Sequence, residues 1–368
     1  MPTPALWTRD HARHFRSDAS SAPRIGADDV VVLKEDLRVW DAWPIQQRDG
    51  SPLLMDDGAE LWMTLAAPYD DDPDKRHDLA RIYLIERNGD RWTDLGPAMP
   101  DGFAPGSREW SGSAVASADG QSVILHFTAS GRRGEHVVTF EQRLFSAEAS
   151  LRKTPEGWRL ADWRGLRETV AIDPQVYMPT TGIGGAPGKI KAFRDPAFFH
   201  DPGDGGDYLF FAGSAADSTS DYNGVIGVAK ASQTASSGWE LLPPIISADG
   251  LNNELERPHV IMHGGLYYLF WSTQRHVFDP AGPTGPTGLY GMVSPTLLSG
   301  WKPLNETGLV FQNPVASPAQ AYAWWVLPDL SVTGFVDDWG DAPGRRFGGS
   351  FAPFVHLKLD GDKAWLAD

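Results

Sequence analysis

A weak repeat built around tryptophan runs through the sequence. Five times, a turn containing Gly is followed by a Trp and then by a Leu; the tryptophans are Trp92, Trp158, Trp239, Trp301 and Trp365. Their spacings of 66, 81, 62 and 64 residues lie near the roughly 74 expected if five equal units fill the chain. Units of this length suit four antiparallel strands with their loops. The repeat therefore predicts an all-β fold, a single-domain five-bladed β-propeller, although Gly-Trp turns could also recur by chance in a chain rich in Trp.

Short runs of β-favouring residues between turn signals support this class. The clearest hairpin joins Ile82–Glu86 to Trp92–Leu95 across Asn88-Gly89, a preferred two-residue turn. The best candidate for a helix is the amphipathic stretch Glu141–Leu151. The other predicted strands are Val30–Leu33, Leu61–Ala66, Ser122–Thr128, Tyr208–Ala212, Val225–Ala229, Leu266–Trp271, Leu289–Val293 and Phe354–Leu359.

Composition and charge narrow the possible partners. The chain has 32 Lys and Arg against 48 Asp and Glu, a net charge of −16, which argues against binding nucleic acid or anionic membranes. With Cys 0, disulfides, thiol nucleophiles and thiolate metal sites are excluded. Trp 15 favours a neutral, sugar-like partner, because flat rings stack on sugar faces. No linker divides the chain, so we expect one domain over residues 1–368, with residues 1–29 as an extension packing on or beside it.

Motifs for metals and phosphates are absent from the sequence. There is no HExxH, P-loop or GxSxG pattern, and the ten His show no ligand spacing. The segment Asp70-Asp71-Asp72-Pro73-Asp74 lacks the alternating ligands of a calcium loop. A solvated acidic loop is the favoured interpretation, and we expect no metal and no cofactor.

Three acidic segments differ from the rest, because each sets a carboxylate among aromatic residues or arginine. Asp41 lies between two Trp, Asp195 follows an Arg, and Glu254 and Glu256 precede another Arg. On a strand, Glu254 and Glu256 would share a face, so that their like charges raise one pKa. A turn with an ion pair and a surface ion-pair cluster are the simpler interpretations of the last two segments.

Four motifs, WDAWP, REWSGSA, FRDPAFF and NELERPHV, resemble in residues and order those of glycoside hydrolase family 68, the levansucrases, inulosucrases and bacterial β-fructofuranosidases. The resemblance extends from about Val39 to Ser272–Arg275, with a plausible tail at Gln320-Ala321-Tyr322. It implies a five-bladed propeller with a central funnel-shaped active site, and sucrose and acceptor sugars as partners.

Residue by residue, the resemblance implies Asp41 as nucleophile, Glu256 as general acid/base and Asp195 as transition-state stabiliser. Asn253 stands where calcium-binding members carry Asp, so the family's structural calcium is not expected. The substrate-binding residues implied are Trp40, Trp110, Ser111, Arg194, Glu254, Gln274, Arg275 and Tyr322.

Spacing agrees with these assignments. The candidates Asp41, Trp110, Asp195, Glu256 and Tyr322 lie 51, 48, 44, 45 and 43 residues before the Trp of their repeat units. If the Trp marks an outer strand, each candidate falls on an innermost strand facing the central channel.

The expected chemistry is retaining cleavage of sucrose through a covalent fructosyl-enzyme, with fructose passed to water or a short acceptor. Glu256 should be protonated, its pKa raised by Glu254, while Asp41 stays ionised at a carboxyl separation of roughly 5–5.5 Å. Gln274 replaces a His that similar Gram-negative levansucrases often carry and that is linked to chain elongation. This favours hydrolysis or short products over levan synthesis.

Two other classes stay open: a non-catalytic sugar-binding propeller, and a five-bladed glycosidase of the plant-invertase or arabinanase kind. No signal peptide and no membrane-length apolar stretch is visible. Because members of the family usually work outside the cell, we expect secretion without a recognisable signal peptide, with a cytoplasmic location as the alternative. A monomer or weak homo-oligomer is expected.

Overall fold

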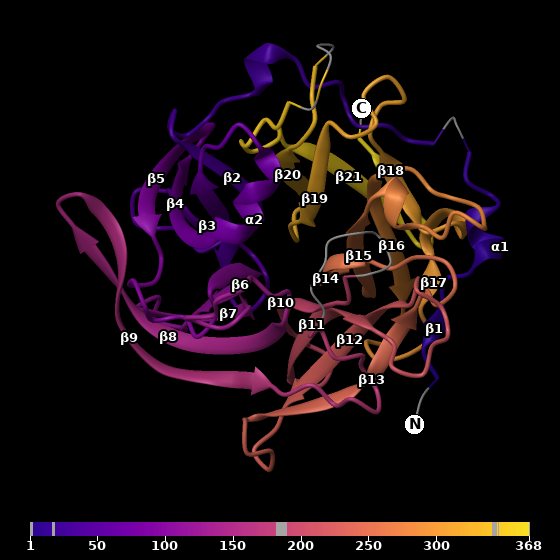
Figure 1. Ribbon diagram of the computed structural model, residues 1–368, viewed down its shortest axis with the longest axis horizontal. Coiled ribbons are helices and arrows are strands. Elements are labelled where there is room, and N and C mark those ends of the chain that lie inside the picture. Colours follow the sequence, from indigo (N-terminus) through magenta and orange to yellow (C-terminus); the bar gives the residue numbers. More distant parts are fainter. Residues whose placement is uncertain (1–2, 17–18, 182–189, 341–343, 345, 368) are drawn as a thin grey trace.

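The computed structural model describes residues 3–16, 19–181, 190–340, 344 and 346–367, and strands dominate this part of the chain (Figure 1). This confirms the predicted all-β class. Among the described residues there is no helix with the length and hydropathy that crossing a bilayer requires. The short helical segments are α1 (Arg9–Ala12), α2 (Arg76–Leu79), and the 3-10 turns η1 (Ala27–Asp29), η2 (Pro73–Lys75), η3 (Arg275–Val277) and η4 (Leu304–Glu306).

The largest sheet has eight strands in the order β5-β4-β3-β2-β6-β7-β8-β9. It consists of two antiparallel groups of four, joined by a short parallel pairing of Ile45 with Ala114 and of Gln46 with Val115. Its strands are β2 (Leu37–Gln46), β3 (Glu60–Pro68), β4 (Arg81–Asn88), β5 (Arg91–Pro97), β6 (Arg108–Ala116), β7 (Ser122–Ser130), β8 (Gln142–Thr154) and β9 (Gly157–Val170).

Three further sheets complete the described fold. One has the order β1-β13-β12-β11-β10, one has β14-β15-β16-β17 with β18 also paired to β16, and one has β19-β20-β21-β22. Their strands are β1 (Ala5–Leu6), β10 (Phe193–His200), β11 (Asp207–Ser214), β12 (Gly224–Ala231), β13 (Trp239–Ser247), β14 (Glu256–His263), β15 (Leu266–Thr273), β16 (Gly288–Ser294), β17 (Lys302–Pro303), β18 (Leu309–Gln312), β19 (Ala321–Val326), β20 (Ser331–Val336), β21 (Val355–Asp360) and β22 (Lys363–Leu366).

The sheets are arranged around a common centre (Figure 1). The first strand of each antiparallel group lies there, and these inner strands contact one another in a closed series: β2 with β6, β6 with β10, β10 with β14, β14 with β19, and β19 with β2. The hydrophobic core continues across the last junction, where Trp92 packs on Phe351 with ring centroids 4.1 Å apart. One end of each inner strand therefore meets its counterparts around the same axis.

The N-terminal segment is tied to two of the sheets. Strand β1 pairs in parallel with β13. The next residue, Trp7, is fully buried, and its indole N–H donates to the Thr307 carbonyl oxygen at 2.8 Å. Its ring packs edge-on against Trp271, so this segment covers core that β13, β15 and β16 would otherwise expose.

The tryptophan repeat marks the outer strands, as its spacing predicted. Four of the five marker residues lie on the last antiparallel strand of their group, and the fifth directly precedes such a strand. They are Trp92 on β5, Trp158 on β9, Trp239 on β13, Trp301 before β17 and Trp365 on β22. The predicted hairpin is also confirmed, but its two-residue turn is Gly89-Asp90 and not Asn88-Gly89, because Asn88 still pairs with Arg91; Gly89 has φ 59°.

Two predictions of local structure are wrong. The stretch Glu141–Leu151, predicted as a helix, lies almost entirely in β8, because hydrogen bonds to β7 and β9 on its two sides override its local helix preference. Residues Val30–Leu33, predicted as a strand, form none, and Val31 is 69% exposed. The other predicted runs fall within observed strands, except that β21 begins at Val355, one residue after the predicted start at Phe354.

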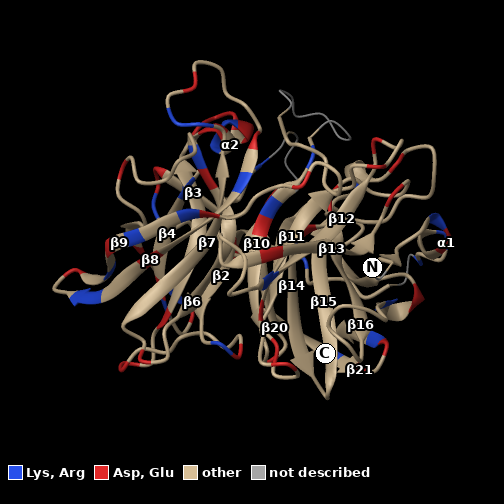
Figure 2. Cartoon of the chain, turned by 90° about the horizontal axis from the view of Figure 1, so that it is seen from below, with Lys and Arg blue, Asp and Glu red and all other residues tan. Residues whose placement is uncertain are grey.

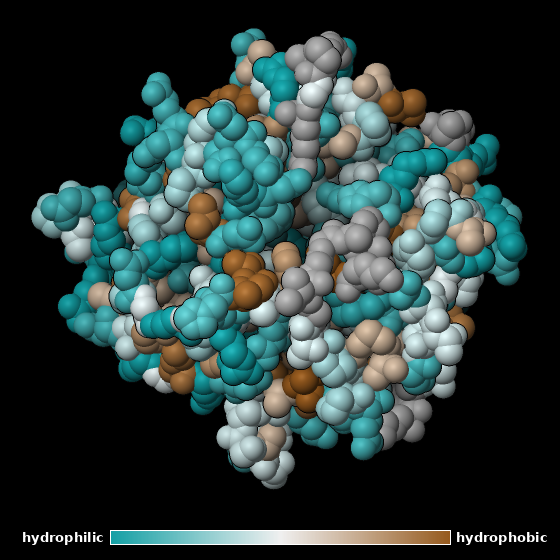
Figure 3. Space-filling view, viewed as in Figure 1, coloured by the Kyte–Doolittle hydropathy of each residue, from teal (hydrophilic) through white to brown (hydrophobic). Residues whose placement is uncertain are grey.

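The face of the molecule in Figure 3 is mostly hydrophilic, with hydrophobic residues in small separate patches. The described residues on this face form no broad apolar area of the kind that marks an interaction surface.

Candidate active site

A cavity of about 610 Å³ lies where the inner strands meet. This is within the usual size of small-ligand sites. Its wall includes residues of all five inner strands, the segment of η2 and α2, and residues beside η3. Acidic and basic residues meet on β10 in the middle of the molecule, and α2 lies at one end of the strands (Figure 2).

Each inner strand is irregular at the cavity. The register with its neighbour shifts at Trp40/Trp43, Trp110/Gly112, Arg194/Ala197, Glu256/His259 and Tyr322/Trp325. Such bulges re-aim side chains, and here two successive residues of each strand line the cavity. The five pairs are Trp40-Asp41, Trp110-Ser111, Arg194-Asp195, Glu256-Arg257 and Tyr322-Ala323.

The second residue of four of these pairs has a left-handed backbone. Asp41, Asp195, Arg257 and Ala323 have φ of 51°, 62°, 51° and 54°. For residues other than Gly this conformation is uncommon and costs energy, and it concentrates at functional sites. In these four pairs, the left-handed residue is part of the backbone irregularity that places both side chains on one cavity.

Two carboxylates are bridged by a serine on the cavity floor. The Ser111 hydroxyl oxygen lies 3.1 Å from Asp41 Oδ2 and 2.8 Å from Asp195 Oδ1. Desolvation and the nearby acidic charges raise the pKa of Asp41 to about 7, against the opposing charge of Arg257. The expectation of a fully ionised Asp41 at neutral pH therefore does not hold for the substrate-free site.

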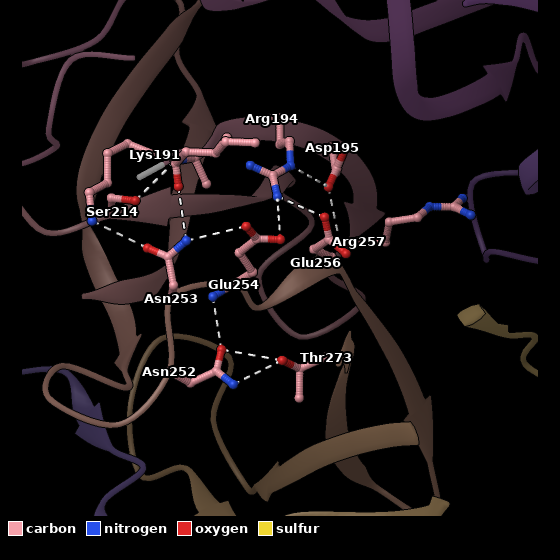
Figure 4. Close-up of polar contacts among 12 residues, drawn as sticks. Lys191, Arg194, Asp195, Ser214, Asn252, Asn253, Glu254, Glu256, Arg257 and Thr273 are labelled. Carbon is pink, nitrogen blue, oxygen red and sulfur yellow. Dashed lines mark hydrogen bonds and ion pairs between the residues drawn. The ribbon is translucent and has the colours of Figure 1, made fainter. Parts of the chain in front are cut away.

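Arg194 joins the remaining acidic groups. Its Nη2 lies 2.7 Å from Glu256 Oε1 and 3.2 Å from Glu254 Oε2, and its Nε lies 3.7 Å from Asp195 Oδ2. Desolvation alone would lower the pKa of Arg194, but the three carboxylates raise it above its usual value. Arg194 is therefore a fixed positive charge among acidic groups (Figure 4).

The pKa values of Glu254 and Glu256 are shifted in opposite directions. Desolvation and the charge of Glu256 raise the pKa of Glu254 to about 7. Desolvation alone would also raise the pKa of Glu256. The charge of Arg194 and the Tyr322 hydroxyl, which donates to Oε2, outweigh it and lower that pKa. One pKa of the pair is raised, as expected, but it belongs to Glu254 and not to Glu256. Glu254 also lies before β14 rather than on it, so the two do not share a strand face.

Arg257 was not predicted as a site residue, although it lines the cavity and is only 2% exposed. Its backbone N–H donates to Asp195 Oδ2 at 3.3 Å and its Nη2 donates to the Ala42 carbonyl oxygen at 2.9 Å. Its guanidinium lies between the rings of Trp43 and Trp325, 5.4 and 5.0 Å from their centroids. Among the described residues, its Nε and Nη1 have no hydrogen-bond partner.

The segment of α2 forms a wall that the sequence did not indicate. The His77 ring meets the Trp40 ring edge-on with centroids 6.0 Å apart, and the Arg76 guanidinium lies 5.6 Å from the centre of Trp40. Asp72 and Asp74, from the acidic stretch interpreted as a solvated loop, also line the cavity. This stretch is therefore part of the wall as well as of the surface.

Ten of the eleven predicted site residues line the cavity, and Arg275 does not. Arg275 is the first residue of η3 and is exposed, whereas Gln274 directly before it and His276 and Val277 after it line the cavity. The placement predicted for Arg275 is corrected accordingly. The residues brought together are Asp41, Asp195, Glu256, Trp40, Trp110, Ser111, Arg194, Glu254, Gln274 and Tyr322.

Metal ligands do not cluster in the described residues: no group of three or more His, Asp or Glu there is arranged to hold an ion. The acids of the cavity are instead paired with Arg194, Arg257 and hydroxyl groups. This arrangement provides proton transfer and nucleophilic carboxylate chemistry.

Comparison with known proteins identifies the family of the chain. The sequence model of the family described as Levansucrase/Invertase, glycoside hydrolase family 68, matches residues 1–223 and 216–367. A levansucrase of Rahnella aquatilis is 31% identical, covering 99% of this chain and 94% of the relative. The structure resembles an inulosucrase from Halalkalicoccus jeotgali bound to kestose, with TM-score 0.89, 34% identity and coverage of 99% and 95%. It also resembles the β-fructofuranosidase catalytic domain of Microbacterium saccharophilum, with TM-score 0.86, 25% identity and coverage of 99% and 91%. The chain with this cavity belongs to the levansucrase/invertase family of enzymes, glycoside hydrolase family 68.

Proposed function

We propose that this protein is a retaining fructosyltransferase that cleaves sucrose and passes the fructosyl group to water or to a short sugar acceptor. The observation that carries the proposal is the placement of Asp41, Asp195 and Glu256 in one cavity of a family 68 chain. The names of its relatives, levansucrase, inulosucrase and β-fructofuranosidase, support the same donor.

In the first step, Asp41 attacks the anomeric carbon of the fructosyl unit. The bond from that carbon to the glycosidic oxygen breaks, and glucose leaves with a proton given by Glu256. In the second step, Glu256 takes a proton from water or a sugar hydroxyl, whose oxygen displaces Asp41 from the same carbon. Asp195 accepts hydrogen bonds from fructosyl hydroxyls and favours the oxocarbenium-like transition state.

The charges of the substrate-free site bear on which glutamate holds the catalytic proton before the reaction begins. In this proposal, Arg194 favours the ionised form of Glu256 before substrate binds, and the raised pKa of Glu254 favours placing a proton on Glu254. In this proposal, sucrose hydroxyls take over the contacts of Arg194 and Glu254, and the proton passes to Glu256. The two glutamates share one proton whose position depends on the ligand.

We further propose that the five antiparallel groups are blades of one propeller domain spanning residues 1–368. The closed series of inner-strand contacts and the marker tryptophans on the outer strands support this. Residues 1–29 would be an extension that packs on the domain, and Trp7 supports this part of the proposal.

Product analysis tests the proposed reaction directly. With concentrated sucrose, we expect glucose release, free fructose and short fructo-oligosaccharides, separated by chromatography, because Gln274 replaces the His linked to elongation. Abundant high-mass levan would instead favour the alternative, a levansucrase. The Gln274→His variant should raise the share of longer products, whereas Gln274→Asn, which keeps an amide, should not.

Two rival classes give different results in the same assay. A non-catalytic sugar-binding propeller would release no glucose from sucrose. A glycosidase of the arabinanase kind would release sugar from arabinan and not from sucrose. Either result would contradict the proposed function.

Arg257 gives a prediction for pH dependence. Its charge lowers the pKa of Asp41, so Arg257→Gln should raise that pKa above its value of about 7. Because Asp41 attacks only when ionised, the acid limb of kcat/KM against pH should move to higher pH by roughly one unit. The charge-retaining Arg257→Lys should keep the limb near its original position, even if the rate falls. An unmoved limb in a folded Arg257→Gln variant, verified by circular dichroism, would contradict this role.

A further inference from the structure

A lysine ammonium group lies in a cluster of oxygen atoms beside the active site. Lys191 Nζ lies 2.6 Å from the Asp221 carbonyl oxygen, 2.9 Å from Asn223 Oδ1 and 3.3 Å from Asn253 Oδ1. The contact with Asn253 is visible in Figure 4. These oxygens come from two segments, one preceding β12 and one preceding β14, so the ammonium links them.

The orientation of both asparagines is fixed by other contacts. Asn223 and Asn253 are fully buried. Asn223 Nδ2 donates to the Ala215 carbonyl oxygen at 2.8 Å, and Asn253 Nδ2 donates to the Ile190 carbonyl oxygen at 2.9 Å. Because each amide nitrogen already donates to a carbonyl oxygen, each Oδ1 points toward Lys191. A buried oxygen of this kind needs a hydrogen-bond donor or a cation.

The cluster connects to the catalytic cavity through one side chain. Asn253 Nδ2 also donates to Glu254 Oε1 at 3.2 Å, and the other oxygen of Glu254 accepts from Arg194 at 3.2 Å. The Glu254 backbone N–H donates to Asn252 Oδ1 at 2.8 Å (Figure 4). The orientation of Asn253 therefore helps to set that of Glu254.

We propose that the Lys191 ammonium is a built-in cation that positions Asn253, and through it Glu254, where other chains use a metal ion. The residues present do not fit the calcium of the calcium-binding family members, in agreement with the expectation from Asn253. Asn253 supplies a neutral amide, and the oxygens that a divalent ion would need are already bound by the Lys191 ammonium, whose positive charge repels a second cation. The effect on catalysis rests on the proposed function, whereas the effect on stability does not.

The first test replaces the ammonium with an apolar group of similar length. Lys191→Met should lower the melting temperature by roughly 3–5 °C, because three oxygens lose a charged donor. It should also raise KM for sucrose roughly three- to tenfold with a smaller change in kcat, since Glu254 is placed to bind substrate. Lys302→Met, the same change at an exposed lysine of β17, should alter neither quantity.

The second test exchanges the built-in cation for calcium. In the double variant Lys191→Ala/Asn253→Asp, a carboxylate joins the remaining oxygens. We expect 10 mM CaCl₂ to raise its melting temperature by roughly 2–4 °C. The unmodified protein should show no calcium-dependent shift and no loss of sucrose cleavage in EDTA.

Three results would overturn the proposal: stabilisation of the unmodified protein by calcium, a Lys191→Met variant with unchanged melting temperature and KM, or a double variant insensitive to calcium. Melting temperatures need no sucrose, so the calcium results stand even if the proposed reaction is wrong. If the unmodified protein does not cleave sucrose, the proposed function fails, and the thermal measurements still decide the role of Lys191.

Discussion

The Asp41→Asn variant should lose at least about 10³-fold in kcat for sucrose while its fold stays intact. The amide has nearly the shape of the carboxylate and can still contact Ser111, but it cannot form the fructosyl ester. Sucrose binding should persist, which calorimetry with the inactive variant can measure.

The control for this experiment is the same substitution at an exposed turn. Asp90→Asn, in the turn between β4 and β5, should retain full activity. Activity within tenfold of the unmodified protein in Asp41→Asn would exclude this residue as the nucleophile. Melting curves of both variants separate a loss of chemistry from a loss of folding.

The second large effect is expected at Glu256. Glu256→Gln removes the proton donor, and kcat for sucrose should fall by about 10²–10⁴-fold. A fructosyl fluoride needs no proton on its leaving group, so its first step should be largely retained. Because the base for the second step is also missing, the fructosyl-enzyme should accumulate, and intact-protein mass spectrometry should detect one added fructosyl unit.

Glu240→Gln, at an exposed position of β13, serves as the matched control and should behave as the unmodified protein. Equal losses with sucrose and with the fluoride would argue against an acid/base role. Accumulation of the covalent species in Glu256→Gln, but not in a Glu256→Gln/Asp41→Asn double variant, would place the attached sugar on Asp41.

The all-β class was predictable because the repeat consists of local sequence patterns. Gly-Trp turns indicate outer strands, and alternating hydrophobic residues indicate strands with one buried face. The wrong prediction at Glu141–Leu151 shows the limit of this approach. Its helical pattern is local, whereas the hydrogen bonds that make it β8 come from strands on both sides.

The acids of the site were predictable from their unusual neighbours, but their protonation was not. The pKa of Glu256 depends on Arg194 and Tyr322, which are 62 and 66 residues away in sequence. No local pattern reports such contacts. The same applies to α2, whose contact with Trp40 is set by the fold of the whole group.

Arg257 could have been found from the sequence by a stricter alignment of the units. The candidates whose spacing was compared mixed the first and second residues of the bulge pairs. When Asp41, Ser111 and Asp195 are aligned as second residues, the matching residue of the next unit is Arg257, directly after Glu256.

Because the inner strands form a closed series, catalytic activity requires that all of the sheets have assembled. Asp41 is on the first inner strand and Tyr322 on the last, so β19 must reach β2 before the cavity has its full set of groups. Contacts between residues so far apart form late in folding, because closing a long loop costs entropy. During refolding, sucrose cleavage should thus return together with the slowest structural phase, when β19 meets β2.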